Sequence, residues 1–249
     1  MKALILAAGY ATRLYPITKC IPKPLLPVMG KPMVEYILDK IALIDDIDKV
    51  FIVTNEKFYP HFKIWHDRVK AAGVYDKEIT ILNDHTTADG TKLGAVGDIN
   101  FVIKEGKIDD DLLIIAGDNL FEFNLQDFVD YFKKKNMPII ALHDVADKEI
   151  AKRMGVVELS PEKKLIDFKE KPEKPKTTLI STCCYLFPKN KLSRVQEYLD
   201  KGNKPDAPGY YIAWLYENDD VYGWVFSESW FDIGDIEQYE KANKQYGGI

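Results

Sequence analysis

Short apolar runs alternate with segments of helical periodicity through the first 145 residues, and this alternation limits the possible folds most strongly. The runs are each long enough for one buried strand and lie at residues 3–7, 50–54, 79–82, 112–116 and 138–142. Between them, apolar residues recur at helical spacing over residues 33–42, 57–72, 93–104 and 125–135. Strands that alternate with helices predict an α/β fold, with a Rossmann-like, mostly parallel central sheet flanked by helices on both faces.

The rhythm changes after about residue 145. We expect strands at residues 156–159, 165–168, 179–187 and 221–226, a turn at 160–163 between the first two, and helices at 192–201 and 236–246. No Gly/Ser-rich linker separates the two parts. The sequence therefore predicts one domain over residues 1–249, in which the half 146–249 adds strands and helices to the unit that the half 1–145 begins.

The stretch from Ala3 to Val28 reads ALILAAGYATRLYPITKCIPKPLLPV and is the most informative about chemistry. Small residues around Gly9 follow the first apolar run, which would let backbone N–H groups approach a phosphate closely. Four prolines then predict a stiff, non-helical loop that holds Arg13, Lys19 and Lys23 near the end of the strand, and such cations suit a polyphosphate. Similar turns also occur in α/β proteins without a ligand, and this one is neither a Walker loop nor a dinucleotide fingerprint.

Composition argues against several classes of partner. The net charge is −5 at pH 7 and no basic run stands out, so nucleic acid is not expected as a partner and a polyanion would need a local cationic pocket. No apolar run approaches the length of a membrane span, and the first residues lack the pattern of a signal peptide. Cys20, Cys183 and Cys184 are odd in number and two are adjacent, which argues against a disulfide framework and favours a cytoplasmic location.

Two carboxylates stand just past predicted strands. Asp118 follows the run 112–116, and Asp232 follows the last strand. Such groups from distant parts of the chain could converge on one Mg²⁺ and leave positions open for phosphate oxygens. The alternative for Asp118 is a cap on the following turn. Asp235 is expected to cap the helix that begins at Ile236, which leaves Asp232 without a local explanation.

A third charged group is Glu170-Lys171-Pro172. Charge runs of this kind are usually solvated edges. Pro172, however, would end the preceding strand and fix where Glu170 and Lys171 project.

Together these segments resemble the sugar-1-phosphate nucleotidyltransferases, which make nucleoside-diphosphate sugars. The resemblance spans nearly the whole chain and rests on Ala-Ala-Gly-x-x-Thr-Arg-Leu, Pro-Lys-Pro-Leu-Leu-Pro, Gly-Asp-Asn, Glu-Lys-Pro and Trp-x-Asp-x-Gly in the family's order. The chain looks most like the short glucose-1-phosphate thymidylyl- and uridylyltransferases, so no C-terminal β-helix is expected. Residues 1–145 would then form the nucleotide-binding half, and residues 146–249 the half that binds the sugar phosphate.

The resemblance also implies roles for individual residues. Asp118 and Asp232 would hold Mg²⁺, Glu170 would bind sugar hydroxyls and Lys171 the sugar phosphate. The residues expected to act in catalysis are Arg13, Lys23, Asp118 and Lys171. Those expected to contact the nucleotide are Leu6, Ala8, Gly9, Thr12, Gly90 and Thr91. Those expected to contact the acceptor are Asn119, Gly155, Glu170, Lys171 and Thr182.

Some residues depart from the family's pattern. Ala11 stands where the family usually has Gly, Met154 where thymidylyltransferase-like members often have Tyr, and Cys183 where a Gly commonly lets the sugar approach. Residues 207–212 lack the acidic pattern of the better-known thymidylyltransferases. These departures concern the acceptor more than the phosphates and the metal.

The reaction expected from the resemblance is nucleotidyl transfer from a nucleoside triphosphate, with dTTP or UTP favoured, to a sugar 1-phosphate, with glucose 1-phosphate favoured. A phosphate dianion is already a nucleophile, which agrees with the lack of a nucleophilic triad signature. One alternative is transfer to a non-sugar phosphate such as phosphocholine, for which an aromatic cage could form from Tyr185, Tyr210, Tyr211 and Trp214. Another is a non-catalytic nucleotide-sugar sensor. The oligomeric state stays open.

Overall fold

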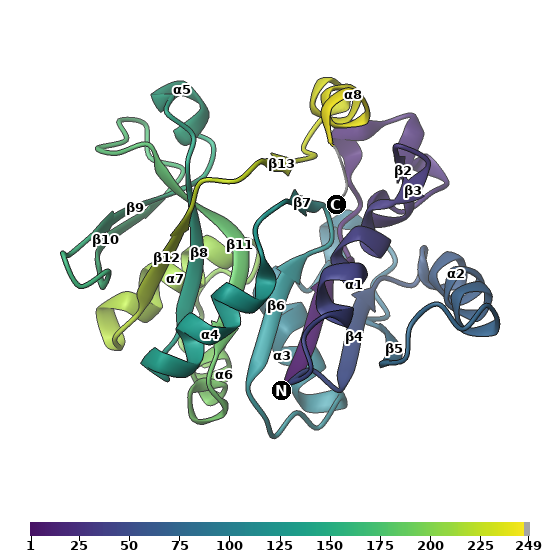
Figure 1. Cartoon of the computed structure of the whole chain (residues 1–249), viewed down its shortest axis with the longest axis horizontal. Helices are drawn as coiled ribbons and strands as arrows, with labels where there is room; N and C mark the ends of the chain where they lie inside the picture. The colour runs from purple at the N-terminus through teal and green to yellow at the C-terminus, as the bar shows by residue number, and fades with distance from the viewer. Residues whose placement is uncertain (247–249) are drawn as a thin grey trace.

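A computed structural model of the chain describes residues 1–246 and centres on a nine-stranded sheet (Figure 1). Four parallel strands form one side, in the order β5 (Glu78–Asn83), β4 (Lys49–Thr54), β1 (Lys2–Leu6) and β6 (Leu112–Ala116). Next to β6 the sheet continues with the antiparallel β11 (Leu179–Phe187), where it branches. One branch pairs β11 with β8 (Ile139–Asp144), which pairs with β12 (Tyr222–Phe226). The other branch pairs β11 with the hairpin of β9 (Gly155–Leu159) and β10 (Leu165–Glu170). The predicted α/β fold with a mostly parallel sheet is confirmed.

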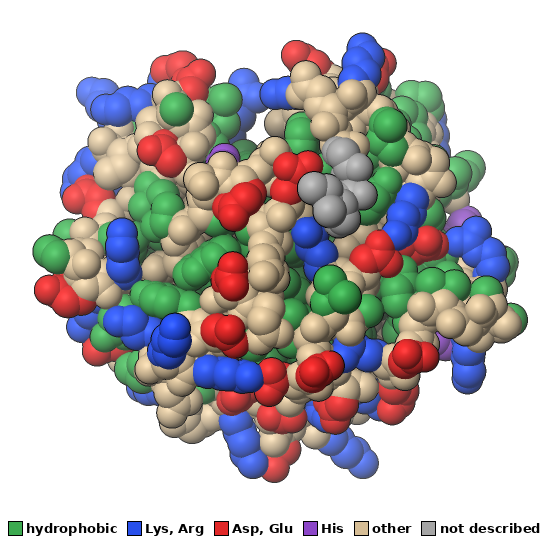
Figure 2. All heavy atoms as spheres, viewed as in Figure 1, with side chains coloured by type: hydrophobic (Ala, Val, Ile, Leu, Met, Phe, Trp, Pro, Cys, Tyr) green, Lys and Arg blue, Asp and Glu red, His purple; other side chains and the backbone are tan. Residues whose placement is uncertain are grey.

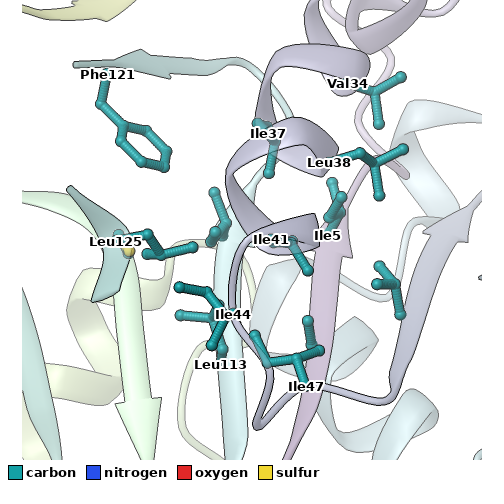
Figure 3. Close-up of a cluster of buried hydrophobic side chains, with 14 of the residues drawn as sticks. Ile5, Val34, Ile37, Leu38, Ile41, Ile44, Ile47, Leu113, Phe121 and Leu125 are labelled. Atoms are coloured by element: carbon teal, nitrogen blue, oxygen red, sulfur yellow. The ribbon is translucent and has the colours of Figure 1, made fainter. Parts of the chain in front are cut away.

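Helices cover both faces of the sheet because its central strands are apolar throughout. On β1, Ile5 belongs to one buried cluster and its neighbour Leu4 to the other, as expected where successive side chains point to opposite faces. The cluster around Ile5 packs against α1 (Met33–Ala42), α2 (Tyr59–Ala71) and α4 (Leu125–Lys135), and its contact with α1 is shown in Figure 3. The cluster around Leu4 packs against α3 (Ala95–Glu105), α6 (Ser193–Asp200) and α7 (Pro208–Asn218).

The loop after β1 differs from the prediction of a non-helical segment. It contains three single turns of 3-10 helix, η1 (Thr12–Leu14), η2 (Ile17–Lys19) and η3 (Lys23–Leu25). The first of these, η1, contains no proline. A proline at the start of a helical turn loses no hydrogen bond, and its fixed φ suits the turn, so Pro16 before η2 and Pro24 in η3 do not prevent these short helices. The segment is still anchored, because the Thr18 hydroxyl donates to the Ala11 carbonyl at 2.8 Å.

Several short elements were not predicted. The hairpin β2 (Pro27–Val28) and β3 (Lys31–Pro32) follows η3, and α5 (Lys148–Ala151) precedes β9. The helix α7 was also missed, since Pro208-Gly209 at its start is typical of a turn. The strands β7 (Asn119–Phe121) and β13 (Trp230–Asp232) pair with each other outside the main sheet, and α8 (Ile236–Gln245) follows. This small pair brings residues 230–232 beside the segment that follows β6.

The visible surface carries mixed charge. Figure 2 shows Lys and Arg side chains interspersed with Asp and Glu side chains over one face of the molecule. Among residues 1–246, no helix combines the length and the apolar character needed to cross a bilayer. The three cysteines are free thiols.

Candidate active site

A cleft of about 380 Å³ opens at the carboxyl ends of β1 and β6. Parallel α/β sheets commonly bind ligands at this edge. Most of the predicted site residues line the cleft, namely Leu6, Gly9, Arg13, Lys23, Asp118, Asn119, Gly155, Glu170, Thr182 and Asp232. They come from both halves of the chain, so the cleft joins the turn after β1 to the strands of the second half.

The turn after β1 is held by polar contacts behind it. The Asn55 side-chain amide donates to the Ala8 carbonyl at 2.8 Å, and the Tyr10 hydroxyl donates to the Thr86 carbonyl at 3.0 Å. Ala11 adopts a left-handed conformation with φ of 48°. Glycine, the residue usual at this position in the family's pattern, would adopt that conformation without strain. Above Gly9 there is open space where a side chain would begin. The turn therefore presents an unobstructed backbone to the cleft.

Lys23 and Asp118 form an ion pair inside the cleft. The Lys23 side chain is largely buried, and its Nζ lies 2.5 Å from Asp118 Oδ2. Asp118 follows β6, while Lys23 begins η3, so the pair closes a loop of nearly a hundred residues. A buried cation with one carboxylate partner keeps donors free for a further anion.

Asp232 lies beside Asp118 because β13 pairs with β7 in the register that sets Asp232 opposite Asn119. Burial raises the pKa of Asp232 to about 6, and the negative charge of Asp118 adds to the rise, while Lys23 and Arg13 oppose it. Two neighbouring carboxylates that repel each other are a donor set that suits a hard divalent cation. Within residues 1–246 no group of three or more His, Cys, Asp and Glu side chains is gathered for a metal, so phosphate and water oxygens would have to complete its shell.

Asn119 and Thr182 line the cleft, but their side chains already have protein partners. The Asn119 amide donates to the Thr182 carbonyl, and its Oδ1 accepts from the Trp230 indole at 3.3 Å. The Thr182 hydroxyl donates to the Ala141 carbonyl at 3.1 Å. Both residues are almost fully buried. The two side chains thus tie β7, β8, β11 and β13 together around the cleft.

Glu170 occupies the opposite end of the cleft at the end of β10. Its side chain is only 8% exposed, and burial raises the pKa of its carboxyl, opposed by the charge of Lys171. Two glycines make room for it, because a Cβ on Gly209 would lie 1.8 Å from Glu170 Oε2 and one on Gly155 would lie 3.1 Å away. A buried carboxylate in such a cradle is suited to accept hydrogen bonds from a ligand.

Some predicted residues lie outside the cleft lining. Lys171 follows Glu170 with φ of 48°, and its exposed side chain places Nζ 3.8 Å from Glu170 Oε1. Ala8 is buried behind the turn, Thr12 begins η1 on the surface, and Gly90 and Thr91 lie on the exposed η4 (Asp89–Thr91). The cleft does not gather these residues.

Other lining residues were not predicted as contacts. Ser181 and Tyr185 come from β11, Pro208 from α7 and Trp230 from β13, and only Tyr185 had been considered, for the aromatic cage. Phe168 could have been found, because it stands two positions before Glu170 on the same strand and therefore on the same face. Met154 and Cys183 had been noted only as departures from the family's pattern, and both line the cleft. Burial raises the pKa of Cys183 to about 12, so its thiol stays neutral.

The suggested aromatic cage is wrong. Tyr185 lines the cleft, but Tyr211 and Trp214 stack on each other in the core beneath α7, with ring centroids 6.2 Å apart. Tyr210 lies at the surface with Lys204 over its ring. Tyr210 and Tyr211 are adjacent on α7, and adjacent positions of a helix point to different sides, so the rings of this helix cannot all face one ligand.

Comparisons with known proteins agree on one family. The family described as "Nucleotidyl transferase" matches residues 2–248. The bifunctional protein GlmU of Methanocaldococcus jannaschii is 30% identical over 98% of this chain and 54% of its own length. The UTP–glucose-1-phosphate uridylyltransferase of Synechocystis is 28% identical over 97% of this chain and 62% of its own length. The chain thus spans little more than half the length of these curated relatives.

Solved structures share the fold over the whole chain. A Bacillus anthracis protein assigned as a glucose-1-phosphate thymidylyltransferase, crystallised with sucrose, has a TM-score of 0.85 at 25% identity and covers 100% of this chain and 96% of that one. A UDP-glucose pyrophosphorylase complexed with UDP-glucose has a TM-score of 0.80 at 22% identity, covering 98% of this chain and 97% of that one, and it shows the fold alone.

Proposed function

This chain belongs to the nucleotidyl transferase family, and we propose that it transfers a nucleotidyl group from a nucleoside triphosphate to a sugar 1-phosphate. The products would be a nucleoside-diphosphate sugar and pyrophosphate. The observation that carries the proposal is the single cleft that joins the Lys23–Asp118 pair and Asp232 at one end to the Glu170 cradle at the other. One end is built for phosphate charge, and the other for a ligand rich in hydrogen-bond donors.

The bond-making step needs position and charge more than a base. An oxygen of the sugar phosphate would attack the α-phosphorus in line, and pyrophosphate would leave as that bond forms. Arg13 and Lys23 would neutralise the leaving pyrophosphate, and Lys171 would hold the attacking phosphate beside Glu170. Asp118 and Asp232 would hold Mg²⁺, which when bound supplies positive charge to the phosphate oxygens.

The choice of substrates is part of the proposal. We favour dTTP or UTP as the donor and glucose 1-phosphate as the acceptor. Relatives named as a UTP–glucose-1-phosphate uridylyltransferase and as a glucose-1-phosphate thymidylyltransferase support this choice. Phosphocholine is not favoured, since three of the four rings considered for a cage lie outside the cleft lining.

The test is pyrophosphate release with Mg²⁺ over a grid of five nucleoside triphosphates and several phosphates, including four hexose 1-phosphates and phosphocholine. Release that needs both substrates and falls by about 10²–10³-fold in Asp118→Asn would support the proposal. The matched control is Asp45→Asn, since Asp45 is exposed near the amino end of β4, at the opposite edge of the sheet. Release with phosphocholine alone would overturn the acceptor. Tight binding of nucleoside-diphosphate sugars with no release would favour the sensor.

A further inference from the structure

Behind the turn after β1, two buried carboxyl groups face each other. Asp84 follows β5, and Asp98 lies in the first turns of α3, and each residue is 6% exposed. Their side chains are within hydrogen-bonding reach of each other. Two ionised carboxylates in such a place would repel strongly, which favours a single proton shared by the pair.

Hydrogen bonds decide which member carries the proton. Asp84 Oδ1 accepts from the Thr86 backbone N–H at 2.7 Å and from the Thr86 hydroxyl at 2.8 Å, and these donors stabilise its charged form. Asp98 Oδ1 is fully buried and has no partner among the described residues. The unpartnered oxygen of Asp98 and the two donors on Asp84 favour Asp98 as the member that holds the proton. In agreement, burial raises the pKa of Asp98 to about 8, and the charge of Asp84 contributes to the rise.

The pair is connected to the nucleotide end of the cleft through Thr86. The Thr86 carbonyl accepts from the Tyr10 hydroxyl at 3.0 Å and from the Glu56 N–H at 3.1 Å. Tyr10 follows Gly9 directly and is buried. A displacement of Asp84 would move Thr86, and the Tyr10 hydroxyl would lose the acceptor that fixes its side of the turn.

We propose that Asp98 is a positioning residue: its proton binds Asp84, and the pair holds Thr86 and Tyr10 so that the turn at Gly9 is shaped for a nucleoside triphosphate. When Asp98 ionises, the two carboxylates repel, the contact with Thr86 loosens, and the nucleotide binds more weakly. The coupling to the nucleotide rests on the proposed function, whereas the shared proton does not.

Other charged groups around the pair are engaged elsewhere. The helix α3 packs against β1, β4, α6 and α7. Lys2 of β1 pairs with Asp48 and Lys49 of β4 with Glu78, both at the amino ends of their strands. The charged side chains of α6 bind one another or the residues around them, and α7 carries only an exposed Glu217. Lys92, which precedes α3, pairs with Asp89 and Asp206. On the Thr86 side, burial raises the pKa of the Tyr10 hydroxyl, and the charges of Asp84 and Asp89 add to that rise.

The experiment uses the full chain and two variants. Asp98→Asn keeps a donor toward Asp84 at every pH, and Tyr10→Phe keeps the acid pair but removes its link to the turn. Asp127→Asn is the matched control, because Asp127 is an exposed carboxylate in the first turn of α4. Two quantities are measured, the unfolding midpoint without ligand from pH 5 to 9 and the dissociation constant of UTP and of dTTP with Mg²⁺ from pH 7 to 8.5.

The expected results separate the proton from the coupling. Since the pKa of Asp98 is raised on folding, the stability that its proton supplies is lost as pH rises toward 8. The unfolding midpoint of Asp98→Asn should therefore exceed that of the wild type by a difference that grows between pH 5 and 8. Above pH 8 this difference should stay constant. The dissociation constant of the wild type should rise about fourfold between pH 7 and 8.5, as a group of pKa about 8 is lost, but less than twofold in Asp98→Asn and Tyr10→Phe.

Three outcomes would count against the proposal or its premise. A constant gap in unfolding midpoint from pH 5 to 9 would show that Asp98 holds no shared proton. A widening gap with equal pH dependence of nucleotide binding in wild type and Tyr10→Phe would overturn the coupling. If neither UTP nor dTTP binds, the proposed donor is wrong. The unfolding data would still test the shared proton, and binding of CTP, ATP and GTP would then test the coupling. If Asp98→Asn does not fold, Tyr10→Phe decides the coupling by itself.

Discussion

Replacing Asp232 by Asn should make the metal-free protein more stable while it abolishes nucleotidyl transfer. The reason is the unfavourable place of the Asp232 carboxylate, which is half-buried in the cleft next to Asp118. A pKa raised from 3.8 to about 6 corresponds to about 3 kcal/mol of destabilisation once the group is ionised in both the folded and the unfolded chain, at about 1.36 kcal/mol per unit. Asparagine has the same shape and no charge, so it removes this cost.

The sign of the pH dependence follows from linkage. Because folding raises the pKa of Asp232, the folded state holds the proton more tightly, and the associated stability is present in acid and lost as pH rises through about 6. The gap in free energy of unfolding between Asp232→Asn and the wild type should be about 1 kcal/mol at pH 4.5 and reach up to about 3 kcal/mol at pH 8. In a chain of this length each kcal/mol raises the melting temperature by about 2–4 °C.

The assay is urea unfolding in EDTA and again with excess Mg²⁺ at both pH values, with Asp45→Asn as the exposed control. Mg²⁺ should stabilise the wild type and leave Asp232→Asn unchanged, because binding to the folded state alone shifts the unfolding equilibrium. A variant that is no more stable than the wild type at pH 8 in EDTA would refute the reasoning. A gap of the same size at pH 4.5 and pH 8 would refute it as well.

Three further substitutions test other parts of the site. Gly209→Ala should displace the Glu170 carboxylate and lower kcat/KM for the sugar phosphate about 10–100-fold. The dissociation constant of the nucleotide should not change. Equal losses for both substrates would contradict the role of the Glu170 cradle in binding the sugar phosphate. Lys23→Met should lower kcat by about 10²–10³-fold in steady-state kinetics, because it leaves Asp118 without its cation. For the same reason, its free energy of unfolding in urea should fall by about 1–2 kcal/mol. Unchanged activity would rule out the role of Lys23. Asp235→Ala should destabilise the protein by about 1 kcal/mol in urea, since Asp235 Oδ1 caps α8 by accepting from the Gln238 N–H at 2.9 Å, whereas Asp235→Asn should retain most of that stability.

Local patterns in the sequence determined the elements and their caps. The run 112–116 became β6 and the spacing from Met33 became α1, because burial on one or both faces imposes a periodicity that a short window contains. The predicted cap at Asp235 is confirmed, since a cap involves only the next three residues. The order of motifs also sufficed to predict the family to which the chain belongs.

Only the tertiary structure decided which side chains meet. Lys23 reaches Asp118 because β1 and β6 are neighbours, and Asp232 joins them through a strand pair with no periodic signal of its own. Gly209 became the floor beneath Glu170 only once α7 packed against β10, and the same helix carried Tyr211 and Trp214 into the core. Asp84 and Asp98 gave no motif at all. Such contacts depend on strand order, register and helix packing, which long-range burial determines and which no short window of sequence contains.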